Sequence, residues 1–327
     1  MAAEVRLRAP TLDDVPAATA MMNERGLALH GEPEMTEDEL RGWFTLPSVE
    51  LERDVRIALD DSGAVAGYAD LMDRTEEGRR LWVDLRVRPG RADEAVTVAL
   101  LDAMEARARE RAVPGAAIRA VADEAQEPLR QLLEARGYRI ARSSFRMATE
   151  FGGPPPAARP PDGIVVRPYR QGQKERDAYD VVMDPFSDGW DFTPQPYDEF
   201  LHWAGTADSD PTLQWLAPDG GDVAGACLCH PTAHGNMARG WIEMLAVRRP
   251  WRGRGLVRAL LLTAFVEYHR RGQAGAALSV DAEDVTGAVG LYEGVGMHVV
   301  RRLDTYERWL DRDDAETPEQ AWQPASA

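Results

Sequence analysis

The chain has 327 residues, which favours two domains because most domains hold about 100–200 residues. Charged residues make up 28% and hydrophobic residues 44%, a composition that excludes wholesale disorder. With 38 Lys and Arg against 55 Asp and Glu, the net charge is −17. We therefore expect neither a nucleic acid nor an anionic membrane as partner, and the charge favours an amine-bearing one.

The sequence predicts a protein of the cytoplasm. The opening residues MAAEVRLRAPTLDDVP lack the basic and then apolar layout of a signal peptide. No apolar run approaches the length of about 18 residues that a membrane helix needs. Two cysteines cannot make a disulfide framework.

In the first half, the pattern predicts a strand over residues 5–10 and a helix that begins after Thr11, which suits an N-cap. Alternating apolar residues predict strands at 55–61 and 64–72, joined by a turn at Ser62-Gly63, and a further strand at 81–87. Apolar residues at three- and four-residue spacing predict a helix over 94–111.

The second half repeats this order. The pattern predicts strands at 213–217, 222–229 and 241–247 and a helix at 256–271. Residues 60–67 (DDSGAVAG) match residues 218–225 (PDGGDVAG), and residues 121–138 match residues 280–297. The offsets, 158 and 159 residues, agree closely enough to indicate a duplication.

We therefore predict two domains of the α/β (α+β) class, each a mixed central sheet flanked by helices. Their ranges are 1–150 and 164–310. Five prolines in residues 151–163 favour a stiff linker between them. Residues 311–327 form an acidic, polar tail.

A glycine-rich turn joins the strand at 241–247 to the next helix, a place where backbone N–H groups can bind phosphate. A dinucleotide fingerprint would need glycine at Arg258, and a Walker A loop would need a Lys-Ser/Thr pair that is absent. Both nucleotide motifs fail, which leaves a structural turn or another phosphate site.

The turn resembles the acetyl-CoA pyrophosphate loop of the GNAT superfamily of N-acetyltransferases. That loop has Arg or Gln, then two residues of any kind, Gly, one further residue, and Gly or Ala. The matching residues are Arg252, Gly253, Arg254, Gly255, Leu256 and Val257, with Val257 in place of a small residue. Residues 279–297 resemble the same family's fifth strand and following helix through Ala288, Leu291, Tyr292 and Gly296. Asp284 stands where the family usually has Asn, and Met297 where it has Phe.

The resemblance implies two tandem GNAT-like domains whose fourth and fifth strands splay apart. It assigns acetyl-CoA as co-substrate, bound by the loop and Asp284, with pantetheine pairing to the backbone of Leu245, Ala246 and Val247. Tyr292 would protonate the departing CoA thiolate, which the closeness of a thiol pKa of about 8.5 to a phenol pKa of about 10 permits. The alternative for Tyr292 is packing in an amphipathic helix.

Attack by an amine also needs a base, because an alkylammonium group is not nucleophilic at neutral pH. Glu243 is the candidate. By the period of two it shares a strand face with Leu245 and Val247, and its apolar neighbours are expected to desolvate it. The alternatives are an exposed edge carboxylate or one that positions substrate.

The first half lacks these features, which predicts a structural and substrate-shaping role for it. Asp93 and Glu94 stand where phosphate would bind, and Leu133 occupies the place of Tyr292. We therefore predict one acetyl-CoA per chain.

Two other groups of residues are candidates for binding. Cys227, Cys229, His230 and His234 have metal-like spacing, but alternation separates the cysteines from His230, so buried cysteines and no metal are expected. Residues 185–203 are rich in aromatic and acidic side chains, and the resemblance places them at the acceptor site. We expect amine binding by Asp188, Trp190 and Asp191, with Glu199 nearby; core packing is the alternative.

The resulting prediction is an acetyl-CoA-dependent N-acetyltransferase. Its second domain would move the acetyl group to a primary amine of a small molecule by direct attack. The tandem layout is similar to that of the mycothiol synthase family, but the motifs do not identify the acceptor. The protein would be a monomer or homodimer. The alternatives are a non-catalytic acyl-CoA-binding or interaction protein and, third, a nucleotide-dependent oxidoreductase.

Overall fold

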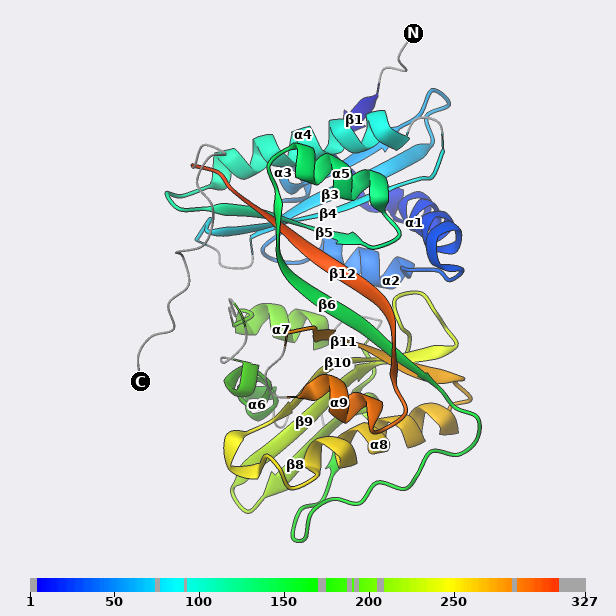
Figure 1. The fold of residues 1–327 in the computed structure, drawn as a ribbon, viewed down its shortest axis with the longest axis vertical. Helices are drawn as coiled ribbons and strands as arrows, with labels where there is room; N and C mark the ends of the chain where they lie inside the picture. Colours follow the sequence, from blue (N-terminus) through cyan, green and yellow to red (C-terminus); the bar gives the residue numbers. More distant parts are fainter. Residues whose placement is uncertain are drawn as a thin grey trace.

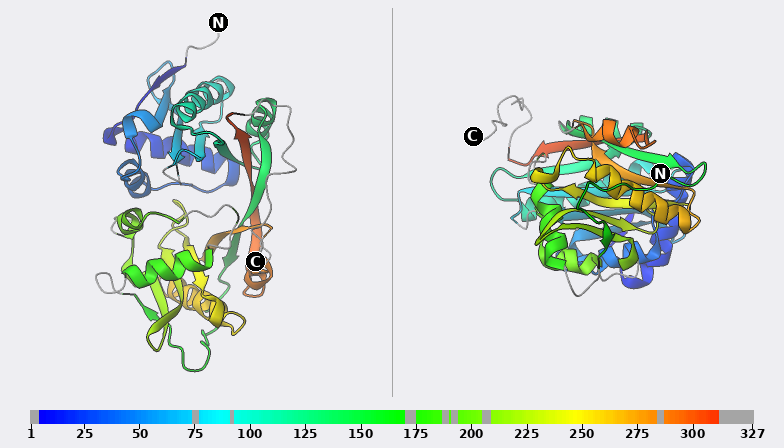
Figure 2. Two further views of the ribbon diagram at one scale, coloured as in Figure 1. Left: turned by 90° about the vertical axis from the view of Figure 1, so that its left-hand side faces the viewer. Right: turned by 90° about the horizontal axis from the view of Figure 1, so that it is seen from below.

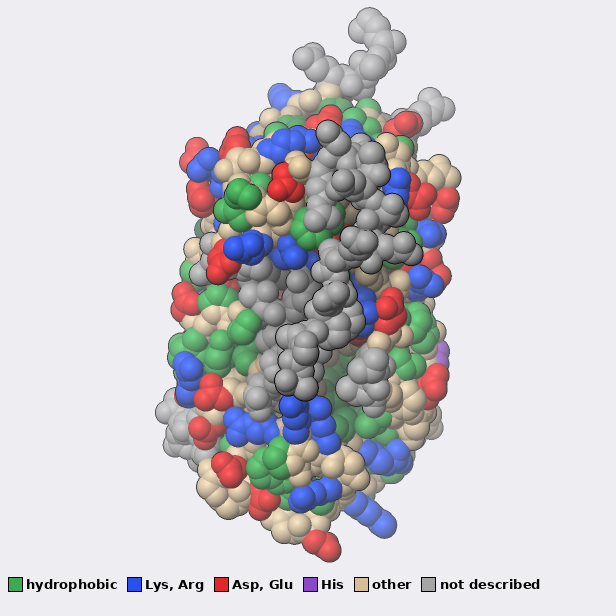
Figure 3. Space-filling view, turned by 60° about the vertical axis from the view of Figure 1, so that its left-hand side comes forward, with side chains coloured by type: hydrophobic (Ala, Val, Ile, Leu, Met, Phe, Trp, Pro, Cys, Tyr) green, Lys and Arg blue, Asp and Glu red, His purple; other side chains and the backbone are tan. Residues whose placement is uncertain are grey.

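The computed structural model describes residues 5–73, 77–90, 93–169, 175–186, 190, 194–204, 209–283 and 287–311. Within these ranges no helix has the length and apolar character needed to cross a membrane. Acidic and basic side chains are interspersed over the face shown in Figure 3.

The strands of the described residues form one twelve-stranded mixed sheet, in the order β1-β2-β3-β4-β5-β12-β6-β11-β10-β9-β8-β7. The first half provides β1 (Arg6–Arg8), β2 (Val55–Leu59), β3 (Val65–Asp73), β4 (Arg80–Val87), β5 (Ala117–Asp123) and β6 (Arg139–Glu150). The second half provides β7 (Arg167–Pro168), β8 (Gln214–Asp219), β9 (Asp222–His230), β10 (Arg239–Val247), β11 (Gly275–Asp281) and β12 (His298–Trp309).

Helices pack against the two halves of this sheet (Figure 1). In the first half they are α1 (Val15–His30), α2 (Glu37–Phe44), α3 (Leu51–Asp54), α4 (Asp93–Arg111) and α5 (Glu127–Ala135). In the second half they are α6 (Glu175–Phe186), α7 (Tyr197–Ala204), α8 (Leu256–Arg270) and α9 (Ala288–Glu293). Thr11 caps the short turn Leu12–Asp14 that leads into α1, so the helix begins near the predicted position.

The last strand of each half lies in the sheet between the two halves. β6 pairs with β11 of the second half, and β12 pairs with β5 of the first. The two strands also pair with each other, from His298 opposite Ala148 to Glu307 opposite Arg139. Figures 1 and 2 show both strands running from one half to the other. The domain ranges 1–150 and 164–310 stay a prediction.

Equivalent hydrogen bonds recur in the two halves, which confirms the duplication. The amide of Tyr138 donates to the carbonyl of Leu133, and the amide of Met297 donates to that of Tyr292. The amides of Arg88 and Arg248 likewise donate to the carbonyls of Ala66 in β3 and Ala224 in β9. The helices α4 and α8 also occupy equivalent places, after β4 and β10.

Each half has its own apolar core between the sheet and its long helix. Leu100 of α4 and Leu260 of α8 are fully buried at equivalent positions. Each faces a glycine, Gly67 in β3 and Gly225 in β9, where an added Cβ would lie 2.8 Å or 3.2 Å from the leucine. The glycines thus let helix and sheet approach closely.

Candidate active site

Two parallel strands of the second half diverge. β10 pairs with β11 from Arg239 to Ile242, and no pairing continues beyond that point among the described residues. On its other side β10 stays paired with β9 as far as Val247. The backbone of Leu245, Ala246 and Val247 therefore faces the gap between β10 and β11, where an extended ligand could pair with it.

Glu243 lies at a bulge in β10. Ile242 pairs with Cys229 and Met244 with the next residue, Leu228, so Glu243 has no partner in β9. The bulge breaks the alternation of side chains. Leu245 and Val247 then pack on the core beneath α8, whereas Met244 lies on the other face beside α6.

Two steps of the sequence argument about Glu243 are therefore wrong. Its side chain is exposed rather than enclosed by apolar neighbours, and it does not lie with Leu245 and Val247, because the period of two is interrupted. It lines a cavity with Met244, and its carboxylate accepts a hydrogen bond of 2.6 Å from the indole of Trp241.

The loop after β10 leads into the N-terminus of α8. Gly253 and Gly255 have φ angles of 73° and 82°, which L-residues rarely adopt, and Gly255 is the N-cap of the helix. Nothing lies within 4 Å of a Cβ placed at either glycine, so the loop surface is open. The first amides of a helix have no acceptor within it, and here they face this opening.

The other loop residues are compatible with this arrangement. Arg252 donates from its Nε to the carbonyl of Val247, at 3.1 Å, and fixes the loop to β10. Arg254 is exposed, and Leu256 is buried. Val257 packs on the core of the second half, so the bulkier residue does not block the helix start. The cradle therefore fits a phosphate group.

Tyr292 lies in α9, half-buried against the same core. Because α9 follows β11, it is near the carboxyl ends of the two diverging parallel strands. Leu133, its equivalent in α5, is fully buried in the core of the first half. Asp284 lies outside the described residues.

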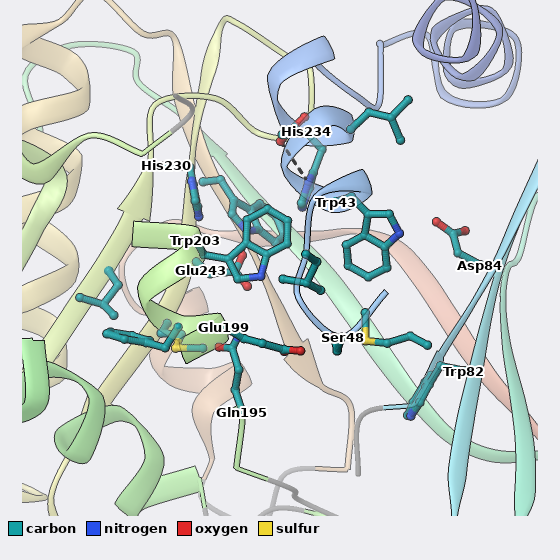
Figure 4. A pocket seen from close by; sticks show the side chains of 18 of the residues that line it. Trp43, Ser48, Trp82, Asp84, Gln195, Glu199, Trp203, His230, His234 and Glu243 are labelled. Atoms are coloured by element: carbon teal, nitrogen blue, oxygen red, sulfur yellow. Dashed lines mark hydrogen bonds and ion pairs between the residues drawn. The ribbon is translucent and has the colours of Figure 1, made fainter. Parts of the chain in front are cut away.

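A cavity of about 850 Å³ lies between the two halves and is lined by both (Figure 4). Equivalent side chains of the two halves line it. α2 and α7 each have eight residues, in which Glu39 and Glu199 hold the third position and Trp43 and Trp203 the seventh. The strands β4 and β10 contribute Trp82 and Trp241, and Asp84 and Glu243. Only Glu199 and Glu243 of these eight were singled out from the sequence, although the repeat offset relates all four pairs.

Carboxylates of the first half are engaged within the protein. Glu39 accepts from the backbone amide of Thr36 and lies 3.6 Å from His234. Burial opposes ionisation of Glu39, but the contact with His234 holds its pKa below the usual value. Asp84 forms an ion pair of 2.7 Å with Arg86.

Trp190 lines the cavity, but a cation of the first half covers its ring. The guanidinium of Arg119 lies 4.4 Å from the ring centre of Trp190 and 5.1 Å from that of Trp82. Trp190 therefore joins the two halves through Arg119, and amine binding by its ring stays a prediction. Asp188 and Asp191 lie outside the described residues.

Cys227 and Cys229 are buried in the core of the second half, with their sulfurs 3.5 Å apart. The contact between the thiols, together with burial, raises the pKa of Cys227. His230 and His234 instead line the cavity. Within the described ranges, no group of three or more His, Cys, Asp or Glu side chains could hold a metal ion.

Comparisons with known proteins agree with this geometry. The profile of the Acetyltransferase (GNAT) family matches residues 176–297. A mycothiol acetyltransferase from Geodermatophilus obscurus is 31% identical over 265 residues, 75% of this chain and 78% of that protein. A mycothiol acetyltransferase from Kocuria rhizophila is 24% identical over 304 residues, covering 90% of this chain and 93% of that protein.

Solved structures share the whole fold. A GCN5-related N-acetyltransferase from Sphaerobacter thermophilus superposes with a TM-score of 0.75 at 30% identity, covering 93% of this chain and 95% of that one. A tandem GNAT protein from the clavulanic acid biosynthesis pathway superposes with a TM-score of 0.68 at 17% identity, covering 94% and 98%.

The splayed strands and the tandem architecture are thus those of an acyl-transferring fold. The chain belongs to the GNAT family of acetyltransferases. It is an N-acetyltransferase, and its second half carries the family match. Members of the family use acetyl-CoA as co-substrate.

Proposed function

We propose that the second half transfers the acetyl group of acetyl-CoA to a primary amine of a small molecule. The observation that carries this proposal is the divergence of β10 from β11 beside the bulged Glu243, with the open loop of Gly253 and Gly255 at the start of α8. A thioester bound between the strands would lie beside a carboxylate, with its phosphates at the helix N-terminus.

In this proposal the backbone of Leu245, Ala246 and Val247 pairs with the pantetheine arm. The amides of Gly253, Gly255 and Leu256 bind the pyrophosphate, with Arg252, Arg254, Val257 and Asp284 around it. The first half binds no acetyl-CoA, because Glu94 and the buried Leu133 replace the groups that would be needed. One acetyl-CoA per chain is the expected stoichiometry.

The reaction then needs a base for the amine and an acid for the departing thiolate. Glu243 accepts a proton from the alkylammonium group, directly or through water, and the free amine nitrogen attacks the thioester carbonyl carbon. The tetrahedral intermediate collapses, the carbon–sulfur bond breaks, and Tyr292 protonates the departing thiolate. The amide and CoA are the products, and the second amine proton returns to solvent.

A small molecule is favoured as acceptor because the cavity is closed in by both halves. Among the described lining residues, carboxyl side chains outnumber arginines by six to three: Glu39, Asp70, Asp73, Asp84, Glu199 and Glu243 against Arg80, Arg86 and Arg119. Even with Asp70 protonated, since burial raises its pKa to about 7, the carboxylates outnumber the arginines, and this excess of negative charge suits a cationic amine. Trp190, Asp188 and Asp191 would add to the same wall. The similarity to mycothiol acetyltransferases makes the acceptor of those enzymes one candidate. We place the enzyme in the cytoplasm, as a monomer or homodimer.

The test is CoA-thiol release with a panel of amines, for the wild type and two variants. Tyr292→Phe should slow turnover by about 10- to 100-fold with little change in acetyl-CoA affinity, because a general acid is worth about 10²–10⁴ and a thiolate leaves readily. Glu243→Gln should shift the pH–rate profile as well as lower the rate.

Calorimetry with acetyl-CoA separates catalysis from mere binding. If acetyl-CoA binds but no amine releases CoA, the chain is a non-catalytic acyl-CoA-binding protein. If Tyr292→Phe keeps the full rate, Tyr292 is not the acid.

A further inference from the structure

The carboxylates of the cavity differ in whether they have partners. Glu39 and Asp84 of the first half are paired with His234 and Arg86. Their second-half equivalents are Glu199 and Glu243. Glu243 accepts only the neutral indole N–H of Trp241 among the hydrogen bonds and ion pairs of the described residues.

Glu199 has fewer interaction partners than Glu243. It is 9% exposed, and within the described part of the chain it takes part in no hydrogen bond, ion pair or ring contact. Phe200 of the same helix α7 packs into a core cluster of the second half, while Glu199 lines the cavity. Figure 4 shows the side chain reaching from α7 into the space between the halves.

A carboxylate that has lost most of its water and gained no partner is costly to the folded protein. Its counterpart in α2 shows that the fold can supply a partner at this position, since Glu39 has both a capping amide and His234. The missing partner at Glu199 is therefore best explained by a ligand. The surroundings favour a cation, because Trp203, from the next turn of α7, also lines the cavity, 6.2 Å from Trp43.

We propose that Glu199 binds a second cationic group of the acceptor, separate from the amine that is acetylated at Glu243. The acceptor class is then a dication, such as a diamine or polyamine, with one ammonium group at each carboxylate. This inference rests on the proposed function, since it takes Glu243 as the place of the reacting amine.

The probes are matched pairs of acceptors, α,ω-diamines from 1,3-diaminopropane to 1,6-diaminohexane and the monoamines of equal length. For the wild type, one or more diamines should show a KM about tenfold or more below that of the matched monoamine, because a hydrogen bond to a charged group is stronger than a neutral one. Glu199→Gln should remove that advantage, raising the KM of the diamine much more than that of the monoamine, and leave the acetyl-CoA KM unchanged.

Asp198→Asn is the matched control, since Asp198 is the exposed neighbour of Glu199 on the same helix. It makes the same change of charge outside the cavity, and the diamine advantage should survive. Calorimetric binding of the best diamine in the absence of acetyl-CoA gives a second measurement, with a loss of about tenfold expected for Glu199→Gln alone. Glutamine has the same shape and needs no desolvation of charge, so this variant is expected to fold.

Equal KM values for diamines and monoamines in the wild type would overturn the inference, as would an equal effect of Glu199→Gln on both. In those cases an active enzyme still supports the proposed function. If no amine of any kind releases CoA, it is the proposed function that fails, and diamine binding by calorimetry still decides whether Glu199 holds a cation.

Discussion

Asp70 is an ionisable group whose charge opposes folding. It is buried in β3 and accepts a hydrogen bond of 2.6 Å from the hydroxyl of Tyr68. Burial, with the nearby charge of Asp84, raises the pKa of Asp70 to about 7. Between the ordinary carboxyl pKa of about 4 and this value, the folded chain holds a proton that the unfolded chain has lost.

The free energy of unfolding should therefore decrease as the pH rises through this window, by at most about 1.4 kcal/mol per pH unit from this group. Asp70→Asn removes the titration. Between pH 5 and pH 8, the Tm measured by calorimetry should fall by several degrees more in the wild type than in this variant. Asp61→Asn, in an exposed turn, is the control and should follow the wild type. Parallel profiles for wild type and Asp70→Asn would show that Asp70 does not titrate in this range.

At the scale of the element, phosphate binding at the N-terminus of α8 can be tested separately from the stability of the helix. Gly255 at the N-terminal end of α8 and Gly272 just beyond its C-terminal end both have φ of 82°, and neither has an atom within 4 Å of an added Cβ. Alanine at either position should cost about 1–2 kcal/mol of backbone strain.

The two variants should differ in binding. Gly255→Ala disturbs the amides that would bind pyrophosphate, so acetyl-CoA affinity should fall about tenfold by calorimetry, whereas Gly272→Ala should leave it unchanged. Similar losses of Tm in both variants would show that strain alone is not the cause. Equal affinity for acetyl-CoA in both would place the phosphates elsewhere.

Local patterns predicted the hairpin strands, α4 and α8 closely, because each is fixed by its own periodicity and by glycine turns. The bulge at Glu243 was not predicted, since side chains were assumed to alternate without interruption along the strand. That one inserted residue decides which face Leu245 and Val247 occupy. The repeat offset could have predicted which cavity residues of the two halves are equivalent. It could not predict that equivalent carboxylates have different partners, because these partners come from contacts between the halves, such as that of Glu39 with His234.

For the whole molecule, strand pairing was the least predictable feature. β6 and β12 are equivalent strands, and nothing local to either tells whether it joins its own half or the other. The structure places both in the middle of one sheet, so each half is completed by the other. Glu32 of the first half adds polar contacts across the junction, accepting from Asn236 at 2.6 Å and pairing with Arg239 at 3.2 Å and Arg301 at 2.9 Å.

This continuity predicts that the chain unfolds in a single cooperative transition. The equivalent core residues Leu100 and Leu260 give a matched test, because both are fully buried and each packs beside a strand glycine. Leu100→Ala and Leu260→Ala should each lower the free energy of unfolding by about 2–5 kcal/mol. In differential scanning calorimetry, either variant should move the one transition as a whole. Losing the first half would leave β12 without both of its strand partners and β11 without one, and losing the second would do the same to β6 and β5. Two peaks, with only the mutated half shifted, would mean that the halves fold independently despite the shared sheet.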